Sequence, residues 1–348
     1  MNALYSLFAV FALVVIAMLG AGAAGMEQFF GLYIPWLAIA IFLIGFVAKV
    51  IGWAQSPVPF RIPTTAGQMK SLDWIEHDKY DNPQTAGQTF VRMALEVLCF
   101  RSLFRNVAAQ RFGSSADGVD VKIRYASSKW LWMFALIFHY AFLIVFVRHW
   151  RLFLDPVPGF FTGLEFADGL LQIGVPTLYL TDVALVLGVT LLLMRRFLIP
   201  QVRYISLPAD YFPLFLILGV ALSGIVMRYW AKTDVIAIKE MTMALFTLNP
   251  AVHAEGIGSI FYIHLFLVSC LIAYFPMSKL MHMGGVFLSP TRNLPNNSRE
   301  KYHRNPWNDP NVKVHTYAAY EDDFREKMIE AGLPVEKTLE EAAQTEAE

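Results

Sequence analysis

The sequence predicts an all-α integral membrane protein, built as a bundle of six transmembrane helices. The chain has 348 residues, of which 56% are hydrophobic and only 16% are charged, whereas soluble proteins average roughly 25% charged residues. The apolar residues gather in long runs, and the charged residues gather in one internal segment and near the C-terminus. We therefore expect lipid to be the main solvent of this chain.

Six segments are apolar and long enough to cross a bilayer, whose hydrocarbon core of about 30 Å requires about 20 helical residues. The first has no basic region before it, so we interpret it as a retained span and not as a cleaved signal peptide. The fourth is short and contains Asp182. The predicted spans are Leu4–Ala24, Leu32–Trp53, Trp130–Trp150, Thr177–Met194, Tyr211–Ala231 and Ser259–Met281.

These spans and the polar segments between them divide the chain into four parts. Residues 1–53 form two N-terminal transmembrane helices, residues 54–129 an insert, residues 130–283 a four-helix core, and residues 284–348 a hydrophilic tail that ends in acidic residues. Within the insert, Gln88–Phe112 is amphipathic and basic. It either covers a soluble subdomain or lies on the inner headgroups as an interfacial helix, and we favour the second alternative.

Positive charge in the short connections predicts the orientation of the bundle. Arg195, Arg196 and Arg203 lie between the fourth and fifth spans, so the positive-inside rule places that connection in the cytoplasm. Six spans then leave both termini and the insert cytoplasmic, in a multi-pass protein of the cytoplasmic (inner) membrane. Arg148 and Arg151 lie at the outer end of the third span and depart from the rule.

Cysteine usage excludes several kinds of site. Cys99 and Cys270 occur without a CxxC or CxxCH motif. The chain therefore has no disulfide framework, cannot hold a cysteine-ligated iron–sulfur cluster alone, and offers no covalent attachment for c-type haem. Both cysteines are interpreted as small apolar residues.

Histidines on two spans are the strongest functional signal. Of the eight histidines, His139 and His149 lie ten residues apart on the third span, and His264 and His282 lie eighteen apart around the sixth. A polar group inside a span is costly and usually functional. The other four, His77, His253, His303 and His315, occur in loops and in the tail with no ligand spacing.

The two spans run in opposite directions, so their histidines form pairs at two depths. His149 and His264 lie near the outer face, and His139 and His282 lie toward the inner face. Neutral imidazole is a common axial ligand of haem iron, and two imidazoles leave the iron no open position for oxygen chemistry. We therefore predict two b-type haems that carry electrons.

The spacings do not match perfectly. Ten residues rise about 15 Å along a helix and eighteen rise about 27 Å. The spacing of ten also leaves about 80° of rotation between His139 and His149. A tilt of the helices, inclined haem planes or a kink at Pro276 would absorb the difference.

The two histidine spacings resemble those of the cytochrome b (gamma) subunit of respiratory nitrate reductases, over roughly residues 130–285. The resemblance implies a nitrate reductase gamma subunit-like core, an inner haem bound by His139 and His282, and an outer haem bound by His149 and His264. It also implies that quinol is oxidised near the outer haem and that electrons descend to a cytoplasmic iron–sulfur subunit.

The histidine-bearing segment from Lys129 to Arg151, the extra N-terminal span, the insert and the tail are similar to one branch, the DsrM-type membrane cytochromes of sulfate- and sulfur-metabolising bacteria. The membrane subunits of heterodisulfide reductases are also similar. This branch implies menaquinol as substrate, a DsrK-like iron–sulfur partner, and other membrane and periplasmic subunits. No nucleic-acid partner is expected.

Charged residues near the outer pair are further candidates. Arg148 and Arg151 either extend to the headgroups from the end of the span or bind the propionates of the outer haem. Asp182 lies about one turn inside the fourth span and is the candidate proton acceptor for quinol, although a hydrogen bond near the helix start explains it equally well. Asp168 and Gln172 lie on the same side.

A proton-coupled transporter that uses the histidines as a relay is the alternative from another functional class. Such transporters usually show internal repeats and helices broken by Gly or Pro near the membrane midplane. Neither feature is visible in this sequence, so the cytochrome interpretation is favoured. A haem spectrum of the purified chain separates the two.

Overall fold

The computed structural model describes residues 1–56, 63, 65–112, 122–171, 176–251, 256–289, 291–297 and 315–339. Contacts divide the chain into two compact units, one formed by residues 1–57 and 62–296 and the other by residues 58–61 and 297–348. The first unit contains the candidate functional residues. Each unit is described by itself.

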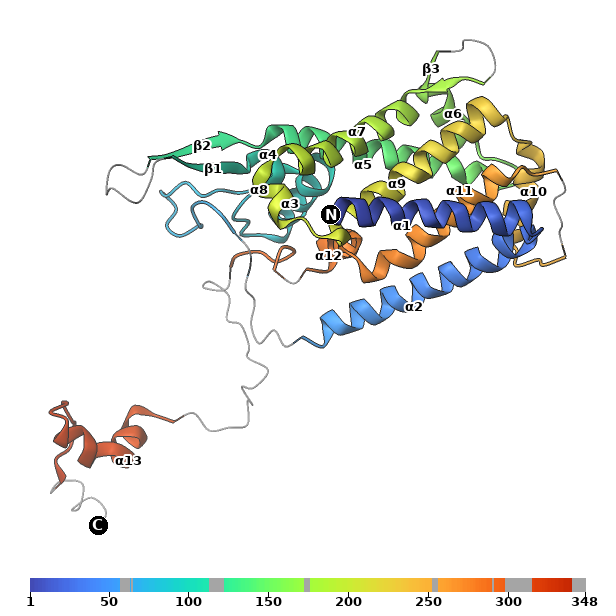
Figure 1. Ribbon diagram of the computed structural model, residues 1–348. Helices are drawn as coiled ribbons and strands as arrows, with labels where there is room; N and C mark the ends of the chain where they lie inside the picture. Colours follow the sequence, from blue (N-terminus) through green and yellow to red (C-terminus); the bar gives the residue numbers. More distant parts are fainter. Residues whose placement is uncertain are drawn as a thin grey trace. The chain divides into compact units, whose positions relative to one another are not determined.

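Long helices that alternate in direction make up the first unit (Figure 1). The N-terminus lies at the same end of this unit as the insert between the second and third long helices. Within the described residues the long helices are α1 (Asn2–Ala17, continued by η1, Met18–Ala23), α2 (Ile34–Ala54, preceded by η2, Phe29–Tyr33), α5 (Lys129–His149), α7 (Leu180–Leu198), α9 (Pro208–Val226, continued by η5, Met227–Ala231) and α11 (Ser259–Tyr274).

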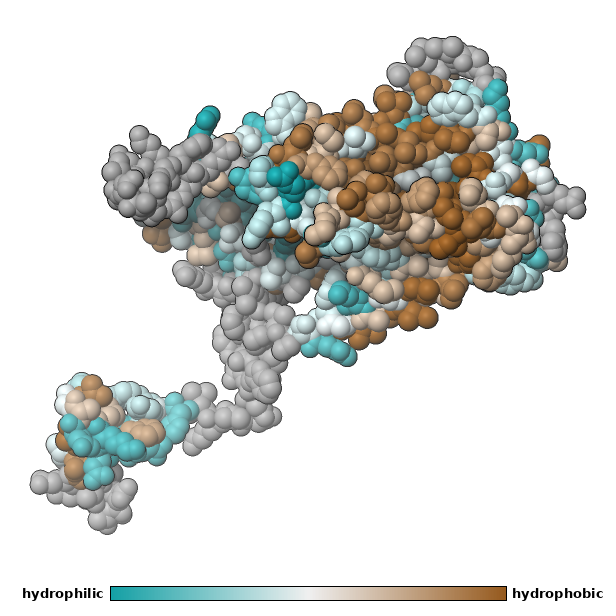
Figure 2. Space-filling view, in the orientation of Figure 1, coloured by the Kyte–Doolittle hydropathy of each residue, from teal (hydrophilic) through white to brown (hydrophobic). Residues whose placement is uncertain are grey.

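The helices pack in a continuous chain of neighbours. Helix α5 packs on α7, α7 on α9, α9 on α1 and α11, and α11 on α2. Leu216 of α9 and Leu267 of α11 are completely buried in the core of the bundle. The outward faces carry large apolar side chains such as Ile44 and Phe146, and Figure 2 shows hydrophobic surface over the middle of the bundle with hydrophilic residues toward its ends. This distribution is typical of a surface that faces lipid.

Five helices in the described part of the chain are long and apolar enough to cross a membrane, and α7 is not among them. Its 19 residues include Asp182, Arg195 and Arg196, so charges lie at both of its ends. It nevertheless packs between α5 and α9, and Gly188 lets its backbone lie directly against α5 at Phe138. The prediction of six spans thus stays a prediction at α7.

The insert differs from the expected single amphipathic helix. A capping box of Thr85 and Gln88 starts α3 (Ala86–Cys99), and Phe100, with a φ of 50°, ends it. The chain continues as α4 (Arg101–Arg105) and as the antiparallel hairpin of β1 (Val107–Phe112) and β2 (Lys122–Ser127). The predicted helix over Gln88–Phe112 is therefore interrupted at Phe100 and wrong from Val107 onward, because pairing with β2 determines the conformation there.

Helix α11 is shorter than the predicted sixth span. It ends at Tyr274 and is followed by the 3-10 turns η6 (Phe275–Met277) and η7 (Lys279–Met281), with Ser278 extended between them. Proline has no N–H to continue a helix, and Pro276 lies at this break. His282 therefore begins a separate helix, α12 (His282–Leu288).

Short elements connect the long helices at both ends of the bundle. Glu96 of α3 binds Arg292, which follows α12, at 3.0 Å, so the insert is attached to the end of the core. The remaining elements of this unit are η4 (Trp150–Leu152), α6 (Gly159–Asp168), β3 (Gly169–Leu171), β4 (Leu178–Tyr179), α8 (Pro200–Ile205) and α10 (Val235–Phe246).

The second unit contains α13 (Tyr317–Glu330), which Thr316 caps through a hydrogen bond from the Ala319 N–H. Glu321 is buried on this helix. Its carboxylate accepts hydrogen bonds from the backbone N–H groups of Glu336 and Lys337. The end of the predicted acidic tail, residues 340–348, lies outside the described residues.

Candidate functional site

Three helices carry the four histidines that the sequence singled out. His139 and His149 lie on α5, His264 lies on α11, and His282 is the first residue of α12. Because the chain breaks at Pro276, His282 need not lie the full rise of a continuous helix away from His264. The break thereby resolves the mismatch between the spacings of ten and eighteen residues.

The structure brings the histidines together in the two predicted pairs. The ring centroids of His149 and His264 lie 6.3 Å apart, with the ring planes inclined by 15°. The ring centroids of His139 and His282 lie 6.1 Å apart, with the planes inclined by 84°. Residues more than a hundred positions apart in the sequence therefore face each other at two places.

Both separations fit an iron atom held between two imidazoles. An imidazole nitrogen binds a transition metal at about 2 Å, and its ring centroid lies about 1 Å further out, so two rings on opposite sides of one metal have centroids about 6 Å apart. The measured 6.3 and 6.1 Å agree with this value. Within the described residues no group of three or more His, Cys, Asp or Glu side chains could hold a bare metal ion, so two-ligand binding suits haem iron best.

Hydrogen bonds prepare each ring for this role. In all four histidines Nδ1 lies within hydrogen-bond distance of a backbone carbonyl oxygen, which selects the tautomer that is protonated at Nδ1 and leaves the Nε2 lone pair for a metal. Within the described part of the chain, no hydrogen bond reaches Nε2 of these rings. The Nδ1 partners are Ala135 O for His139 (2.7 Å), Val145 O for His149 (2.6 Å), Val220 O for His264 (3.1 Å) and Lys279 O for His282 (2.8 Å).

Close packing fixes the ring positions further. Phe100 packs edge-on against the ring of His139 at 5.0 Å. A Cβ atom at Gly224 of α9 would lie 3.2 Å from Cε1 of His264, and the Ser223 hydroxyl lies 3.0 Å from Nδ1 of the same ring. Sequence reasoning missed Phe100, Ser223 and Gly224, because their role depends on which helices become neighbours.

A buried charge cluster lies beside the outer pair. Arg148 is 6% exposed; its guanidinium lies 2.6 Å from Asp182 and 3.2 Å from Asp168 and stacks on the ring of Tyr179 at 3.8 Å. The hydroxyl of Tyr229 donates to Asp182 at 3.1 Å. Asp182, the predicted proton acceptor, is therefore held by an ion pair with Arg148 and by a hydrogen bond from Tyr229.

The second predicted propionate ligand is engaged in the same way. Arg151 contacts both carboxylate oxygens of Glu165 at 2.6 Å. Arg148 and Arg151 thus both have carboxylate partners in this chain, which the sequence analysis did not foresee. Both of the acidic partners Glu165 and Asp168 lie on α6, which packs against α5.

Of the other four histidines, the two that the structure describes do not join these pairs. His77 lies in the insert, and its buried Nε2 has no hydrogen-bond partner among the described residues. His315 lies 3.1 Å from Asp323 in the second unit. His253, His303 and Gln172 lie outside the described residues.

The comparison with known families decides what kind of chain this is. Residues 93–296, more than half of the chain, match the model of the nitrate reductase gamma subunit. The chain belongs to that family. Together with the five apolar helices found in the described part of the chain, this makes the chain a multi-pass membrane protein of the nitrate reductase gamma subunit family.

Curated relatives cover most of this member of the nitrate reductase gamma subunit family. A protein of Archaeoglobus fulgidus is 45% identical over 291 residues, which is 82% of this chain and 85% of the relative. A protein of Archaeoglobus profundus is 40% identical over 288 residues, 81% of this chain and 83% of the relative. Both bear the name Hdr-like menaquinol oxidoreductase cytochrome b-like subunit.

Proposed function

We propose that this chain is the cytochrome b subunit of a menaquinol-oxidising complex and binds two b-type haems through its two histidine pairs. The observation that carries the proposal is the facing of His149 with His264 and of His139 with His282 at the separation that one iron atom requires. The names of the Archaeoglobus relatives, which contain both menaquinol oxidoreductase and cytochrome b-like, support it.

The bound haems would supply one-electron transfer, and the protein would supply the ligands and their spacing. Four neutral imidazoles, each bonded at Nδ1, hold two sites along one side of α5. His139 and His149 are separated by ten residues of this helix, a rise of about 15 Å. We infer that electrons cross the membrane along α5, from the outer pair to the inner pair.

The electron acceptor is proposed to be a cytoplasmic iron–sulfur subunit, as in the DsrK-like partner of the sulfur-metabolising branch. The inner pair lies at the end of the bundle where α12 and the insert gather (Figure 1). The chain itself has no cysteine motif for a cluster. An acceptor must therefore come from another subunit, and a cytoplasmic orientation of this end would place it there.

Quinol is proposed to bind on the outer side, near His149 and Asp182. Oxidation of quinol releases protons, and Asp182 with Tyr229 forms a polar pair at that end of α7 and α9. Arg148 and Arg151 keep a proposed role toward the outer haem as the cations nearest to His149 in sequence. Their carboxylate partners would then have to share them with the propionates.

The pyridine haemochrome spectrum of the purified full chain tests the proposal. We expect two b-type haems per chain. His149→Ala and His264→Ala should each remove the same outer haem, and His139→Ala and His282→Ala should each remove the inner one. His315→Ala, a surface histidine in the second unit, is the matched control and should retain both. A wild-type chain without haem, or partners in one pair that remove different haems, would overturn the proposal and favour the proton-relay alternative.

A further inference from the structure

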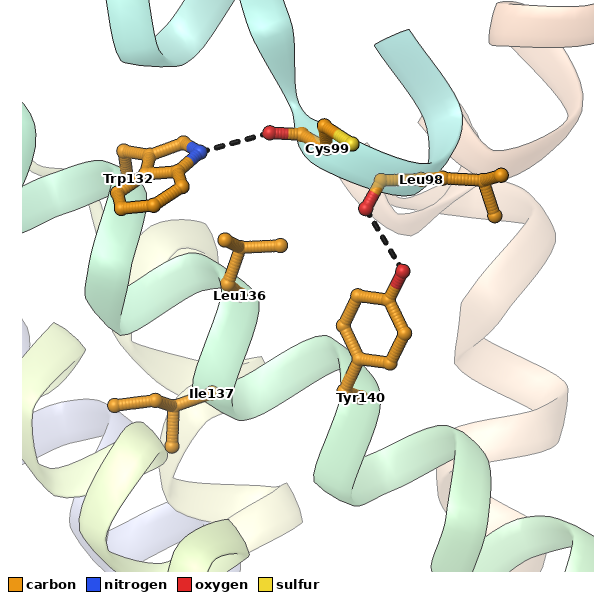
Figure 3. Close-up of a pocket in the computed structure, with 6 residues that line it drawn as sticks. All are labelled: Leu98, Cys99, Trp132, Leu136, Ile137 and Tyr140. Atoms are coloured by element: carbon orange, nitrogen blue, oxygen red, sulfur yellow. Dashed lines mark hydrogen bonds between the residues drawn. The ribbon is translucent and has the colours of Figure 1, made fainter. Parts of the chain in front are cut away.

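A shallow apolar groove lies on the outside of the bundle, where the end of α3 meets α5 (Figure 3). Its volume is about 470 Å³. Four side chains of α5 line one side of the groove, and the last residues of α3 close the opposite side. The groove is lined by Leu98, Cys99, Trp132, Leu136, Ile137 and Tyr140.

The polar groups of the lining are already bonded to the backbone. The indole N–H of Trp132 donates to the carbonyl of Cys99 at 2.8 Å, and the hydroxyl of Tyr140 donates to the carbonyl of Leu98 at 2.8 Å (Figure 3). The remaining side-chain donor is the Cys99 thiol, which is weak. The groove therefore suits a hydrocarbon chain and offers little to the carbonyl oxygens of a quinone.

Cations lie beside one end of the groove. The ammonium group of Lys129 lies 5.0 Å from the ring centroid of Phe104, whose ring packs on Trp132 at 4.9 Å. Among the described residues Lys129 has no carboxylate partner. Arg101 and Arg105 of the neighbouring α4 share the single carboxylate of Asp81. Three cations and one anion leave an excess of two positive charges here.

Along α5, the cations and the apolar groove follow one another in the same order as the headgroups and the hydrocarbon of a bilayer. Trp130 is 69% exposed and lies next to Lys129, and tryptophan and lysine at the end of a span are typical of the headgroup level. The groove extends from Trp132 to Tyr140, a rise of about 12 Å toward the membrane interior. An amphiphile with an anionic head would thus meet cations at its head and apolar walls along its tail.

We propose that this groove binds one phospholipid, with an acyl chain between α3 and α5 and the phosphate beside Lys129. The site is distinct from both histidine pairs and does not depend on the presence of haem. The occupant would hold the end of α3 against α5. Phe100, the residue after the groove-lining Cys99, packs on His139, so the bound lipid would also brace the inner pair.

Native mass spectrometry of the full chain, released from nanodiscs of equal phosphatidylglycerol and phosphatidylcholine, tests the proposal. We expect one retained phosphatidylglycerol per chain. Lys129→Gln should weaken retention about fivefold, since one lysine near a membrane surface contributes about 1 kcal/mol toward anionic lipid. Leu136→Trp, which fills the groove, should abolish retention. Occupancy should also slow the reaction of the exposed Cys99 with a maleimide.

Matched changes on α2 control for general effects of charge and bulk. A second apolar groove of about 450 Å³ is lined by residues of α2 alone, including Val47. Lys49→Gln and Val47→Trp should leave retention at the wild-type level. Equal retention in wild type, Lys129→Gln and Leu136→Trp would overturn the proposal, as would displacement of the lipid by a short-chain menaquinone. Haem content, measured on the same samples, reports separately on the proposed function.

Discussion

The imidazole planes of His149 and His264 are nearly parallel, at 15°, whereas those of His139 and His282 are nearly perpendicular, at 84°. The two pairs are otherwise alike in centroid separation. The difference arises from the elements that carry the partners: His264 lies within the long α11, and His282 starts a new helix after the break at Pro276. The two pairs would thus present differently oriented imidazole planes to a bound iron atom.

The first prediction is that the two proposed haems give different electron paramagnetic resonance spectra. Parallel imidazole planes separate the energies of the two iron d orbitals that interact with the rings, whereas perpendicular planes leave them nearly equal. The oxidised outer haem should therefore give a rhombic low-spin signal, and the inner haem a highly anisotropic one. Spectra of His264→Ala and His282→Ala assign the signals, and two identical signals would contradict the geometry.

The pairing of the histidines was predictable because it depends only on helix direction and residue spacing. Alternating spans place His149 and His264 at one depth and His139 and His282 at another, so these pairs are the ones that form when the two helices face each other. For the unequal rises of ten and eighteen residues, the sequence offered three explanations: helix tilt, inclined haem planes or a kink at Pro276. The structure confirms that α11 ends there.

The surroundings of the pairs were not predictable in this way. Glu165 pairs with Arg151 because α6 folds back toward α5. The sequence periodicity of the two segments does not predict that they pack together. The hairpin of β1 and β2 likewise depends on hydrogen bonds between two strands, which the sequence of neither strand alone predicts. Contacts between separate secondary-structure elements decide both features.

A second prediction concerns the contact of α7 with α5. A Cβ atom at Gly188 would lie 2.9 Å from backbone atoms of Phe138, so Gly188→Ala must push the helices apart. We expect a loss of about 1–3 kcal/mol in stability, as for other overpacked positions, and weaker retention of the inner haem, since Phe138 precedes His139. Thermal unfolding and haem content measure both effects. Gly163→Ala on α6, where a Cβ meets nothing within 4 Å, should cause neither.

A third prediction is a pH dependence of the attachment of α3 to the end of the core. Burial acts to raise the pKa of Glu96, but hydrogen bonds from Ser102 and Arg292 outweigh it and hold the pKa below its usual range. A carboxylate with a lowered pKa in the folded state stabilises the protein above its unfolded pKa of about 4.3. That contribution is lost as the pH falls through the folded pKa.

Thermal unfolding of wild type and Glu96→Gln at a series of pH values measures this contribution. At pH 7 the variant should be less stable by about 1 kcal/mol, a value reduced by the partial exposure of the pair. The difference should shrink as the pH falls below about 4.3, because wild-type Glu96 then becomes neutral as well. A difference that stays constant over this range would rule out the ion pair as its source.

The last prediction separates two roles of Asp182. Its carboxylate binds the guanidinium of Arg148 at 2.6 Å, and Asp168 binds the same guanidinium at 3.2 Å. Asp182→Asn and Asp168→Asn should therefore both lower stability, by about 2 kcal/mol each for a hydrogen bond to a charged group. If Asp182 also accepts a proton from quinol, Asp182→Asn alone should slow haem reduction by a menaquinol analogue, by roughly 10²–10⁴-fold.

Reduction by dithionite serves as the reference in this experiment, because it bypasses the quinol and should be equally fast in both variants and in wild type. Equal rates with the menaquinol analogue in Asp182→Asn and Asp168→Asn would make Asp182 a structural partner of Arg148 and nothing more. His149→Ala addresses the location itself: if electrons start at the outer pair, quinol should no longer reduce the inner haem. Rapid quinol reduction in His149→Ala would instead place the quinol site beside His139 and His282.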